Sequence, residues 1–275
     1  LQCGPLSDDV LVRARFDAWP LSEPAIAPAT WVLFHPDQYR QPGFPFQPLT
    51  GESLCDWVCC RRVITGEPWW IPAELAYLHQ PAGHQFCPGY STGLAAGRTG
   101  EPILLRGLQE VIERDANSLW NQLTEKERAA TRVNISSIED TVCTEVLDML
   151  RQSQLAVAIW DMTSDVAVPA FYCLIVDELH ADGHSGSGAG CHPCREVALL
   201  RALTEAVQVR TNYITGSRDD LMPNEYTDEG IAAKLLRARK LMQAARNRGK
   251  NVSLTPNHVF PTSEQDIDWM LERLT

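Results

Sequence analysis

The sequence predicts an α+β fold, on the basis of three observations. Apolar residues recur at helical spacing through residues 101–122 and 195–213, whereas residues 155–160 and 170–176 are apolar runs of strand length. The expected strands and helices do not alternate regularly, so the parallel sheet of repeated βα units is not predicted. The chain has 275 residues and 44% hydrophobic content, which is sufficient for one large domain or two small ones.

The remaining elements follow from turn signals and caps. Prolines repeatedly interrupt residues 1–50, and we expect only one short strand there, near Thr30–Phe34. Two strands, residues 55–63 and 69–71, are expected to be joined around a turn at residues 65–68. Further helices are predicted at residues 124–131, at 138–152 with Ser136 or Ser137 as its cap, at 227–248 and at 263–274.

Composition excludes several classes of protein. The net charge of −11 at pH 7 argues against a general nucleic-acid binder, because such proteins neutralise phosphates with basic residues. No apolar run of membrane-spanning length is present, and the first residues lack a signal peptide, so a cytoplasmic location is expected.

Nine irregularly spaced cysteines do not suggest a disulfide framework. Cys191 and Cys194 have metal-like spacing, but no second pair accompanies them, and reduced thiols are therefore expected.

Residues 234–250 form a local basic stretch on this acidic chain. They hold seven of the 24 basic residues: Lys234, Arg237, Arg239, Lys240, Arg246, Arg248 and Lys250. A solvated helix face explains such a stretch, and a dock for an acidic peptide or partner is the alternative.

Glu110 and Glu113 are three residues apart in a predicted helix and therefore share one of its faces. Paired carboxylates suit Mg²⁺, which takes oxygen ligands and commonly bridges to nucleotide phosphates. Arg114 follows directly, and its guanidinium suits a phosphate. The alternative is an ordinary solvated helix face.

The predicted helix at residues 195–213 carries a second polar stripe. The stripe consists of Arg201, Glu205, Gln208 and Asn212, at spacings of four, three and four. It could line a nucleotide cleft, although a solvated surface helix would show the same pattern. Arg210 and Arg218 are candidates for phosphate contacts. The glycine-rich loop expected at residues 183–190 could approach a ligand with its backbone, or it could be a disordered connector.

Three sequence blocks together resemble the YcaO family. The first combines Ser-Thr-Gly-Leu-Ala-Ala-Gly-Arg-Thr at 91–99 with Gly-Leu-Gln-Glu-Val-Ile-Glu-Arg-Asp at 107–115. The second runs from the glycine-rich turn at 188–193 through Arg-Ala-Leu-Thr-Glu-Ala-Val-Gln-Val-Arg at 201–210 to Arg-Asp-Asp at 218–220. The third and weaker block is the strand–turn–strand region 158–171. Their order makes the resemblance specific. It implies mixed sheets flanked by helices, with a nucleotide cleft.

The resemblance implies ATP- and Mg²⁺-dependent modification of peptide backbone amides. ATP phosphorylates the amide oxygen so that it can leave, and a Cys, Ser or Thr side chain then gives an azoline ring. Sulfide in place of that side chain would give a thioamide. Glu110 and Glu113 would ligate Mg²⁺, and no residue is assigned a catalytic role. The expected nucleotide contacts are Ser91, Arg98, Thr99, Arg114, Glu205, Gln208, Arg210 and Arg218.

The chain also departs from the family pattern. Thr92, Arg98 and Pro102 stand where relatives often have Asn, Asn and Glu. Residues 1–275 are expected to be a single YcaO-like domain without the family's N-terminal Glu-x-x-Glu block and C-terminal strands. Three interpretations stay open: a segment of a longer enzyme, a degenerate homologue that binds without chemistry, or a protein whose missing half comes from another chain.

The product and the partners are expected from the same resemblance. The proline-rich stretch 39–46 is similar to ring-forming relatives and favours azoline formation, with thioamide formation as the alternative. The expected partners are a precursor peptide, a leader-binding or TfuA-like protein, and a second copy in a homodimer. An α+β domain with no catalytic role is the unrelated alternative.

Overall fold

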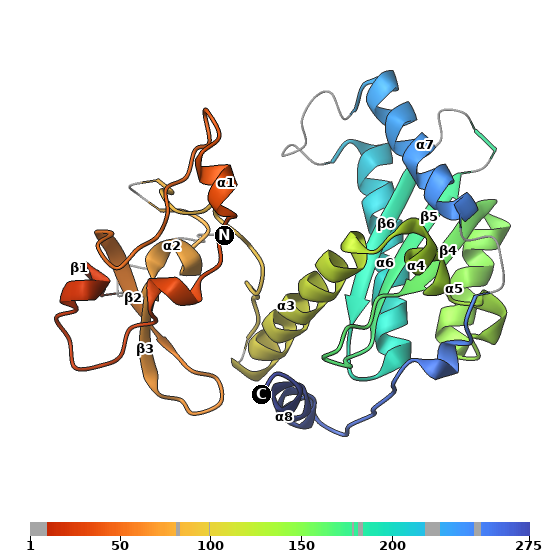
Figure 1. The fold of residues 1–275 in the computed structure, drawn as a ribbon. Coiled ribbons are helices and arrows are strands. Elements are labelled where there is room, and N and C mark those ends of the chain that lie inside the picture. Colours follow the sequence, from red (N-terminus) through yellow and green to blue (C-terminus); the bar gives the residue numbers. More distant parts are fainter. Residues whose placement is uncertain are drawn as a thin grey trace. The chain divides into compact units, whose positions relative to one another are not determined.

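The computed structural model describes residues 10–80, 83–98, 100–177, 179–180, 184–217, 226–244 and 249–275. The chain forms two compact units, Leu1–Ser91 and Thr92–Thr275. Each unit contains a three-stranded antiparallel sheet together with helices, which confirms the α+β class (Figure 1). Among the described helices, none is long and apolar enough to cross a membrane.

The first unit is built around a small sheet with tryptophan in its core. Its elements are β1 (Leu11–Ala14), α1 (Pro36–Tyr39), β2 (Cys55–Arg61), β3 (Pro68–Pro72), α2 (Ala73–Ala76) and two 3-10 helices, Phe16–Ala18 and Pro28–Thr30. Trp57 is fully buried, and its indole N–H donates to the carbonyl of Ala14 (3.1 Å). The strand expected near Thr30–Phe34 is wrong, because Pro28 begins a 3-10 turn there and Pro36 begins α1 directly afterwards.

The second unit holds the sheet β4-β5-β6, with β5 in the centre. The strands are β4 (Leu155–Asp161), β5 (Ala170–Asp177) and β6 (Ser185–Cys191). The helices are α3 (Gly100–Gln122), α4 (Glu125–Ala130), α5 (Thr141–Gln152), α6 (Arg195–Thr215), α7 (Asp228–Ala244) and α8 (Ser263–Arg273), with 3-10 helices at Ile135–Ser137 and Val252–Leu254. The part of the predicted helix 227–248 beyond α7 lies outside the described residues.

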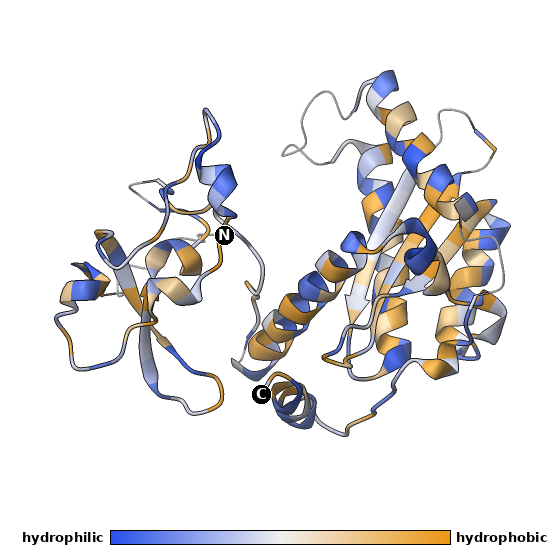
Figure 2. Cartoon of the chain, in the orientation of Figure 1, coloured by the Kyte–Doolittle hydropathy of each residue, from blue (hydrophilic) through white to orange (hydrophobic). Residues whose placement is uncertain are grey.

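Successive residues of β4 and β5 face opposite sides of this sheet and enter two separate cores. Ile159 and Phe171 pack with α5 and α6, whereas Trp160 and Leu174 pack with α3, α7 and α8. The sheet therefore has a core on each face. Helix α3, which packs on one of these faces, carries both hydrophobic and hydrophilic residues along its length (Figure 2).

The glycine-rich stretch is a strand rather than the flexible loop that we expected. Glycines 186, 188 and 190 alternate along β6 and lie against α6. A Cβ atom at Gly188 would lie 2.4 Å from the amide nitrogen of Ala206 and 2.5 Å from the carbonyl oxygen of Ala202. The missing side chains thus let α6 approach the strand backbone, and the loop interpretation is wrong for this physical reason.

Two helices of the second unit, α5 and α6, have identifiable ends. Helix α6 ends at Gly216, whose φ of +58° places it in the left-handed region. Helix α5 begins at Thr141 and is capped by Asp140, which accepts from the amide of Cys143 (2.9 Å). The expected caps Ser136 and Ser137 are therefore wrong. The hydroxyl of Ser137 instead donates to the carbonyl of Asn134 and accepts from the amide of Val252.

Candidate functional site

A polar cleft of about 560 Å³ lies between α3, α6 and the edge strand β6. Charged side chains dominate its wall and come from the inward sides of the two helices. The lining residues are Leu94, Ala95, Ala96, Arg106, Glu110, Glu113, Arg114, Ala189, Arg201, Thr204, Glu205 and Gln208. Two sequence blocks that lie about a hundred residues apart therefore meet at one site.

A hydrogen bond connects the turn before α3 to the carboxylate of Glu110. Gly93 has a φ of +83°, a conformation that other residues rarely adopt, and its amide donates to Oε2 of Glu110 (3.2 Å). The other carboxylate oxygen of Glu110 lies 3.6 Å from the guanidinium of Arg114, one helical turn later. These contacts fix Glu110 between the turn and a cation.

Glu113 is the most perturbed carboxyl group of the cleft. Its pKa is raised to about 7, first by burial and then by the negative charge of Glu205, with Glu110 adding to the effect. Arg201 and Arg114 oppose the shift but do not cancel it. At neutral pH the carboxyl group of Glu113 is therefore divided between its protonated and ionised forms, and a nearby positive charge would favour the ionised form.

Glu205 is held by the backbone of the edge strand. Its Oε2 accepts from the amide of Ala189 in β6 at 2.6 Å. An edge strand leaves amide groups unpaired on its outer side, and this carboxylate satisfies one of them. The negative charge of Glu205 on α6 is thereby placed close to Glu113 on α3, and it raises the pKa of Glu113.

Arg201 forms a second link between α6 and α3. Its guanidinium donates to the side-chain oxygen of Gln109 and to the carbonyl of Cys191 (3.1 Å). Gln109 is 3% exposed, and its amide nitrogen finds no hydrogen-bond partner among the described residues. His192 lies close enough to feel the same guanidinium, and burial followed by Arg201 lowers its pKa to about 4. His192 is consequently neutral at physiological pH.

The donor set of the cleft is consistent with Mg²⁺ and phosphate. Glu110, Glu113 and Glu205 supply oxygen ligands, and Arg106, Arg114 and Arg201 supply cations that match phosphate oxygens. In the described part of the chain, no three His, Cys, Asp or Glu side chains already form a metal-binding group. Burial and the neighbouring carboxylates raise the pKa of Glu113 despite Arg201 and Arg114, and a divalent cation bound there would favour its ionised form.

The structure brings five of the ten predicted site residues together. Glu110, Glu113, Arg114, Glu205 and Gln208 all line the cleft. Their roles as metal and nucleotide ligands stay predictions.

Five other predicted residues are placed differently or are not described. Arg210 does not line the cleft, because its guanidinium contacts the carbonyl of His184 (3.0 Å) and Asp177 (3.6 Å). Arg98 is exposed and is not among the lining residues, and Ser91 belongs to the first unit. Thr99 and Arg218 lie outside the described residues.

Sequence reasoning missed three residues of this site. Arg106 lies one helical turn before Glu110, and Thr204 lies between Arg201 and Gln208 on the same face, so helical spacing could have found both. Gln109 could not be found in this way, because a polar residue beside the charged face is normally solvated.

A family model described as a YcaO cyclodehydratase that binds ATP and Mg²⁺ matches residues 3–275, and so runs across both units. A protein of Rhizobium leguminosarum bv. trifolii, described only as uncharacterized and lying in the tfuA 3' region, is 33% identical over 235 residues. That match covers 82% of this chain and 54% of the relative, so the chain spans about half the relative's length.

Solved structures share the fold at lower sequence identity. A heterocyclase in complex with substrate and cofactor superposes with a TM-score of 0.78 at 23% identity, covering 98% of this chain and 37% of that one. A YcaO protein from Methanopyrus kandleri, bound with AMPPCP and Mg²⁺, gives a TM-score of 0.69 at 20% identity and covers 99% and 64% of the two chains.

Proposed function

The chain belongs to the YcaO family, and we propose that its cleft between α3 and α6 binds Mg·ATP in order to activate a backbone amide of a peptide. The observation that carries this proposal is the convergence of three carboxylates and three arginines from two helices on one cavity. A surface with no ligand has no reason to bury Glu113 beside Glu205, because the two negative charges oppose each other.

Each group of residues has a separate role in this proposal. Glu110 and Glu113 would hold Mg²⁺, which when bound neutralises phosphate charge. Arg106, Arg114 and Arg201 would contact phosphate oxygens, and Gln208 would contact the nucleotide. Glu205 keeps the edge of β6 in place through the amide of Ala189.

In the proposed reaction, ATP converts the amide oxygen of the peptide into a leaving group. A side-chain thiol or hydroxyl of the peptide adds to an amide carbon and gives up its proton, and the former carbonyl oxygen takes the γ-phosphoryl group of ATP, whose bond to ADP breaks. The C–O bond then breaks, the amide nitrogen loses its proton, and the products are an azoline, ADP and phosphate. Phosphorylation is needed because an oxygen attached to the tetrahedral carbon is otherwise a poor leaving group. In this scheme the chain's arginines keep the phosphates in position for the transfer.

Thioamide formation is the second candidate. The observation that favours it is the relative encoded in the tfuA 3' region, together with the TfuA-like partner that the family resemblance implies. The same cleft would serve, since sulfide replaces the peptide's own side chain as nucleophile while the phosphorylated oxygen still leaves. A precursor peptide is a substrate in both cases.

Mass spectrometry tests the proposal on the full-length protein. A set of peptides containing Cys, Ser and Thr would be incubated with Mg·ATP and the protein, with Glu113→Gln as the impaired variant. Glu145→Gln, an exposed carboxylate on α5, is the matched control. We expect ADP formation and loss of one water from the peptide, abolished only by Glu113→Gln. Replacement of oxygen by sulfur when sulfide is supplied would instead indicate the thioamide reaction, and unchanged activity in Glu113→Gln would contradict both.

A further inference from the structure

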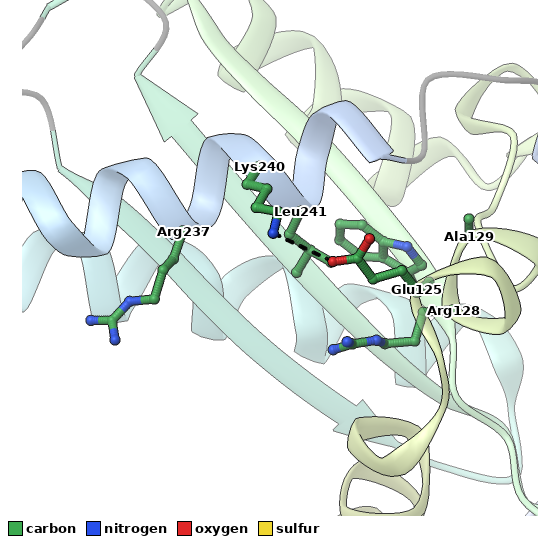
Figure 3. A pocket seen from close by; sticks show the side chains of 7 residues that line it. Glu125, Arg128, Ala129, Arg237, Lys240 and Leu241 are labelled. Atoms are coloured by element: carbon green, nitrogen blue, oxygen red, sulfur yellow. Dashed lines mark ion pairs between the residues drawn. The ribbon is translucent and has the colours of Figure 1, made fainter.

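A second pocket, of about 350 Å³, opens between α4, β4 and α7 (Figure 3). Its lining residues are Glu125, Arg128, Ala129, Trp160, Arg237, Lys240 and Leu241. It therefore presents three cations and one carboxylate, an excess of positive charge on a chain whose net charge is −11. Nothing in the proposed amide activation uses these residues.

The cations of this pocket differ in how far the protein itself satisfies them. Lys240 pairs with Glu125 across the opening (3.5 Å), where both side chains are largely exposed. Arg128 stacks on Trp120 at 5.6 Å, and its buried Nε has no hydrogen-bond partner among the described residues. Arg237 is exposed and forms no ion pair or hydrogen bond within the described part of the chain.

Arg237 stands out from the other basic residues of its segment. Lys234 donates to the hydroxyl of Tyr213, Arg239 to the carbonyls of Asp177 and His180, and Lys250 contacts Asp161. Lys234, Arg239 and Lys250 therefore bind other parts of the protein, whereas the composition of this segment suggests a solvated helix face. An unengaged guanidinium at a pocket mouth is suited to an external carboxylate.

The wall of the pocket is apolar. Trp160 is fully buried, and its indole N–H has no hydrogen-bond partner among the described residues. The indole nitrogen is itself inaccessible to solvent, so Trp160 contributes an apolar floor to the pocket and presents no donor to a ligand. Ala129 and Leu241 complete the apolar wall. The pocket is therefore suited to a ligand that combines an apolar side chain with a negatively charged acceptor.

A neighbouring hollow extends this surface along α7. It has a volume of about 320 Å³ and shares Arg237 and Leu241 with the first pocket. Its other walls come from β5, β6 and α6 and include Tyr172 and Ser187. Two adjoining hollows with a common cation can accommodate successive side chains of an extended segment, whereas a single small anion would occupy only one of them.

This surface is separate from the nucleotide cleft. No residue lines both the cleft and either hollow of the second site. The cleft lies at the β6 edge between α3 and α6, whereas the second pocket includes Trp160 of β4, the opposite edge strand.

We propose that the pocket between α4, β4 and α7 is a docking site for an acidic segment of another polypeptide, with Arg237 binding its carboxylate and Trp160, Ala129 and Leu241 receiving an adjacent apolar side chain. The complementary charge steers an acidic segment to this face of a protein whose overall charge would repel it. Docking here leaves the cleft free for nucleotide.

Fluorescence anisotropy tests this proposal directly. The probe is a fluorescein-labelled peptide of alternating Asp, Glu and Leu, titrated with the full chain at low ionic strength. A peptide of Asn, Gln and Leu serves as the uncharged probe. Arg237→Glu is the test variant, and Arg151→Glu on α5 is the matched control, because its side chain is 80% exposed and pairs with Asp148 of the same helix. Titration of Mg·ATP into each variant checks that the cleft is unaffected.

We expect the acidic probe to bind wild-type protein and Arg151→Glu alike, and to bind Arg237→Glu about tenfold or more weakly, a difference of at least about 1.4 kcal/mol. Binding should decrease with added salt, and the uncharged probe should bind poorly. Mg·ATP binding should not change in Arg237→Glu. Equal binding by both variants, displacement of the probe by inorganic phosphate alone, or no binding up to about 1 mM protein would overturn the proposal.

Discussion

At the scale of a single side chain, Glu113 is the carboxyl group of the cleft whose pKa the fold changes most. Burial and Glu205 raise its pKa to about 7, whereas the same group in an unfolded chain titrates near its ordinary value. The folded state therefore binds a proton more tightly than the unfolded state does. The stability that this proton contributes is fully present below the unfolded pKa and is lost as pH rises through the folded pKa.

Replacing Glu113 by glutamine should accordingly stabilise the metal-free protein at alkaline pH. We expect Glu113→Gln to gain on the order of 2 kcal/mol more at about pH 8 than at about pH 5, as measured by urea unfolding with a chelator present. Glu145→Gln, exposed on α5, should show no such difference between the two pH values. A gain that is equal at both pH values would mean that Glu113 has an ordinary pKa.

Arg201 is the residue whose loss should loosen the contact between α6 and α3. Arg201→Ala removes the donor to Gln109 and to the carbonyl of Cys191, and leaves a buried amide unpaired. The expected loss of unfolding free energy is about 2 kcal/mol. Urea denaturation should detect it, with the exposed Arg151→Ala as a control that changes little. If Arg201→Ala unfolds at the same urea concentration as the wild-type protein, these hydrogen bonds add no stability.

The cleft residues could be predicted well where their spacing is helical. Glu110 and Glu113 share a face of α3, and Glu205 and Gln208 share a face of α6, as the helical spacing predicted. The spacing alone also fitted solvated helix faces, and the family resemblance was needed to favour a cleft. Arg210 was also expected at the site, but it lies two positions after Gln208 and therefore points away, toward Asp177. Gln109 was missed, because only the packing of α6 against α3 makes that position buried.

Among the elements, strand β6 determines how closely α6 can approach the sheet. Its glycines lie against α6, and Ala189 between them donates to Glu205 in the cleft. Sequence alone did not reveal this strand, because period-2 alternation is normally recognised from side chains and three of its seven residues are glycines. The strands β4 and β5 were predicted correctly, since both carry continuous apolar runs, and the structure pairs them antiparallel.

Adding one methyl group to β6 should therefore disturb both the fold and the site. Gly188→Ala places a Cβ within 2.5 Å of α6 backbone atoms, and should destabilise the protein by about 1–3 kcal/mol or more. Thermal unfolding measures the loss. Gly100→Ala is the matched control, because no neighbouring atom lies within 4 Å of its added Cβ. Equal melting temperatures for the two variants would contradict the close approach of α6 to β6.

At the scale of the whole molecule, the chain contains two independent sets of core residues. One core cluster consists only of residues from the first unit, and the other two consist only of residues from Thr92–Thr275. We expect residues 92–275 to fold without the first unit and to unfold in one cooperative transition, as followed by circular dichroism. A sloping, non-cooperative transition would show instead that the second unit depends on the first.

Family and substrate are specified by different parts of the molecule. The α+β class could be predicted from the irregular order of strands and helices, and the family from three sequence blocks, because these blocks carry the turn, the carboxylates and the arginine-bearing helix. Under the proposed function, the choice of peptide depends on surfaces that those blocks do not specify. The chain spans about half of the rhizobial relative and 37% of the superposed heterocyclase, so comparable proteins contain further residues that can contribute such surfaces.

Isothermal titration of Mg·ATP into this chain tests the central claim most directly. The account predicts saturable binding by the wild-type chain and by Glu145→Gln, with binding lost or greatly weakened in Glu113→Gln, whose amide is a poorer cation ligand than a carboxylate. Omitting Mg²⁺ should weaken binding to the wild-type chain in the same way. Undiminished binding by Glu113→Gln, or no binding by any of the three proteins, would contradict a nucleotide site between α3 and α6.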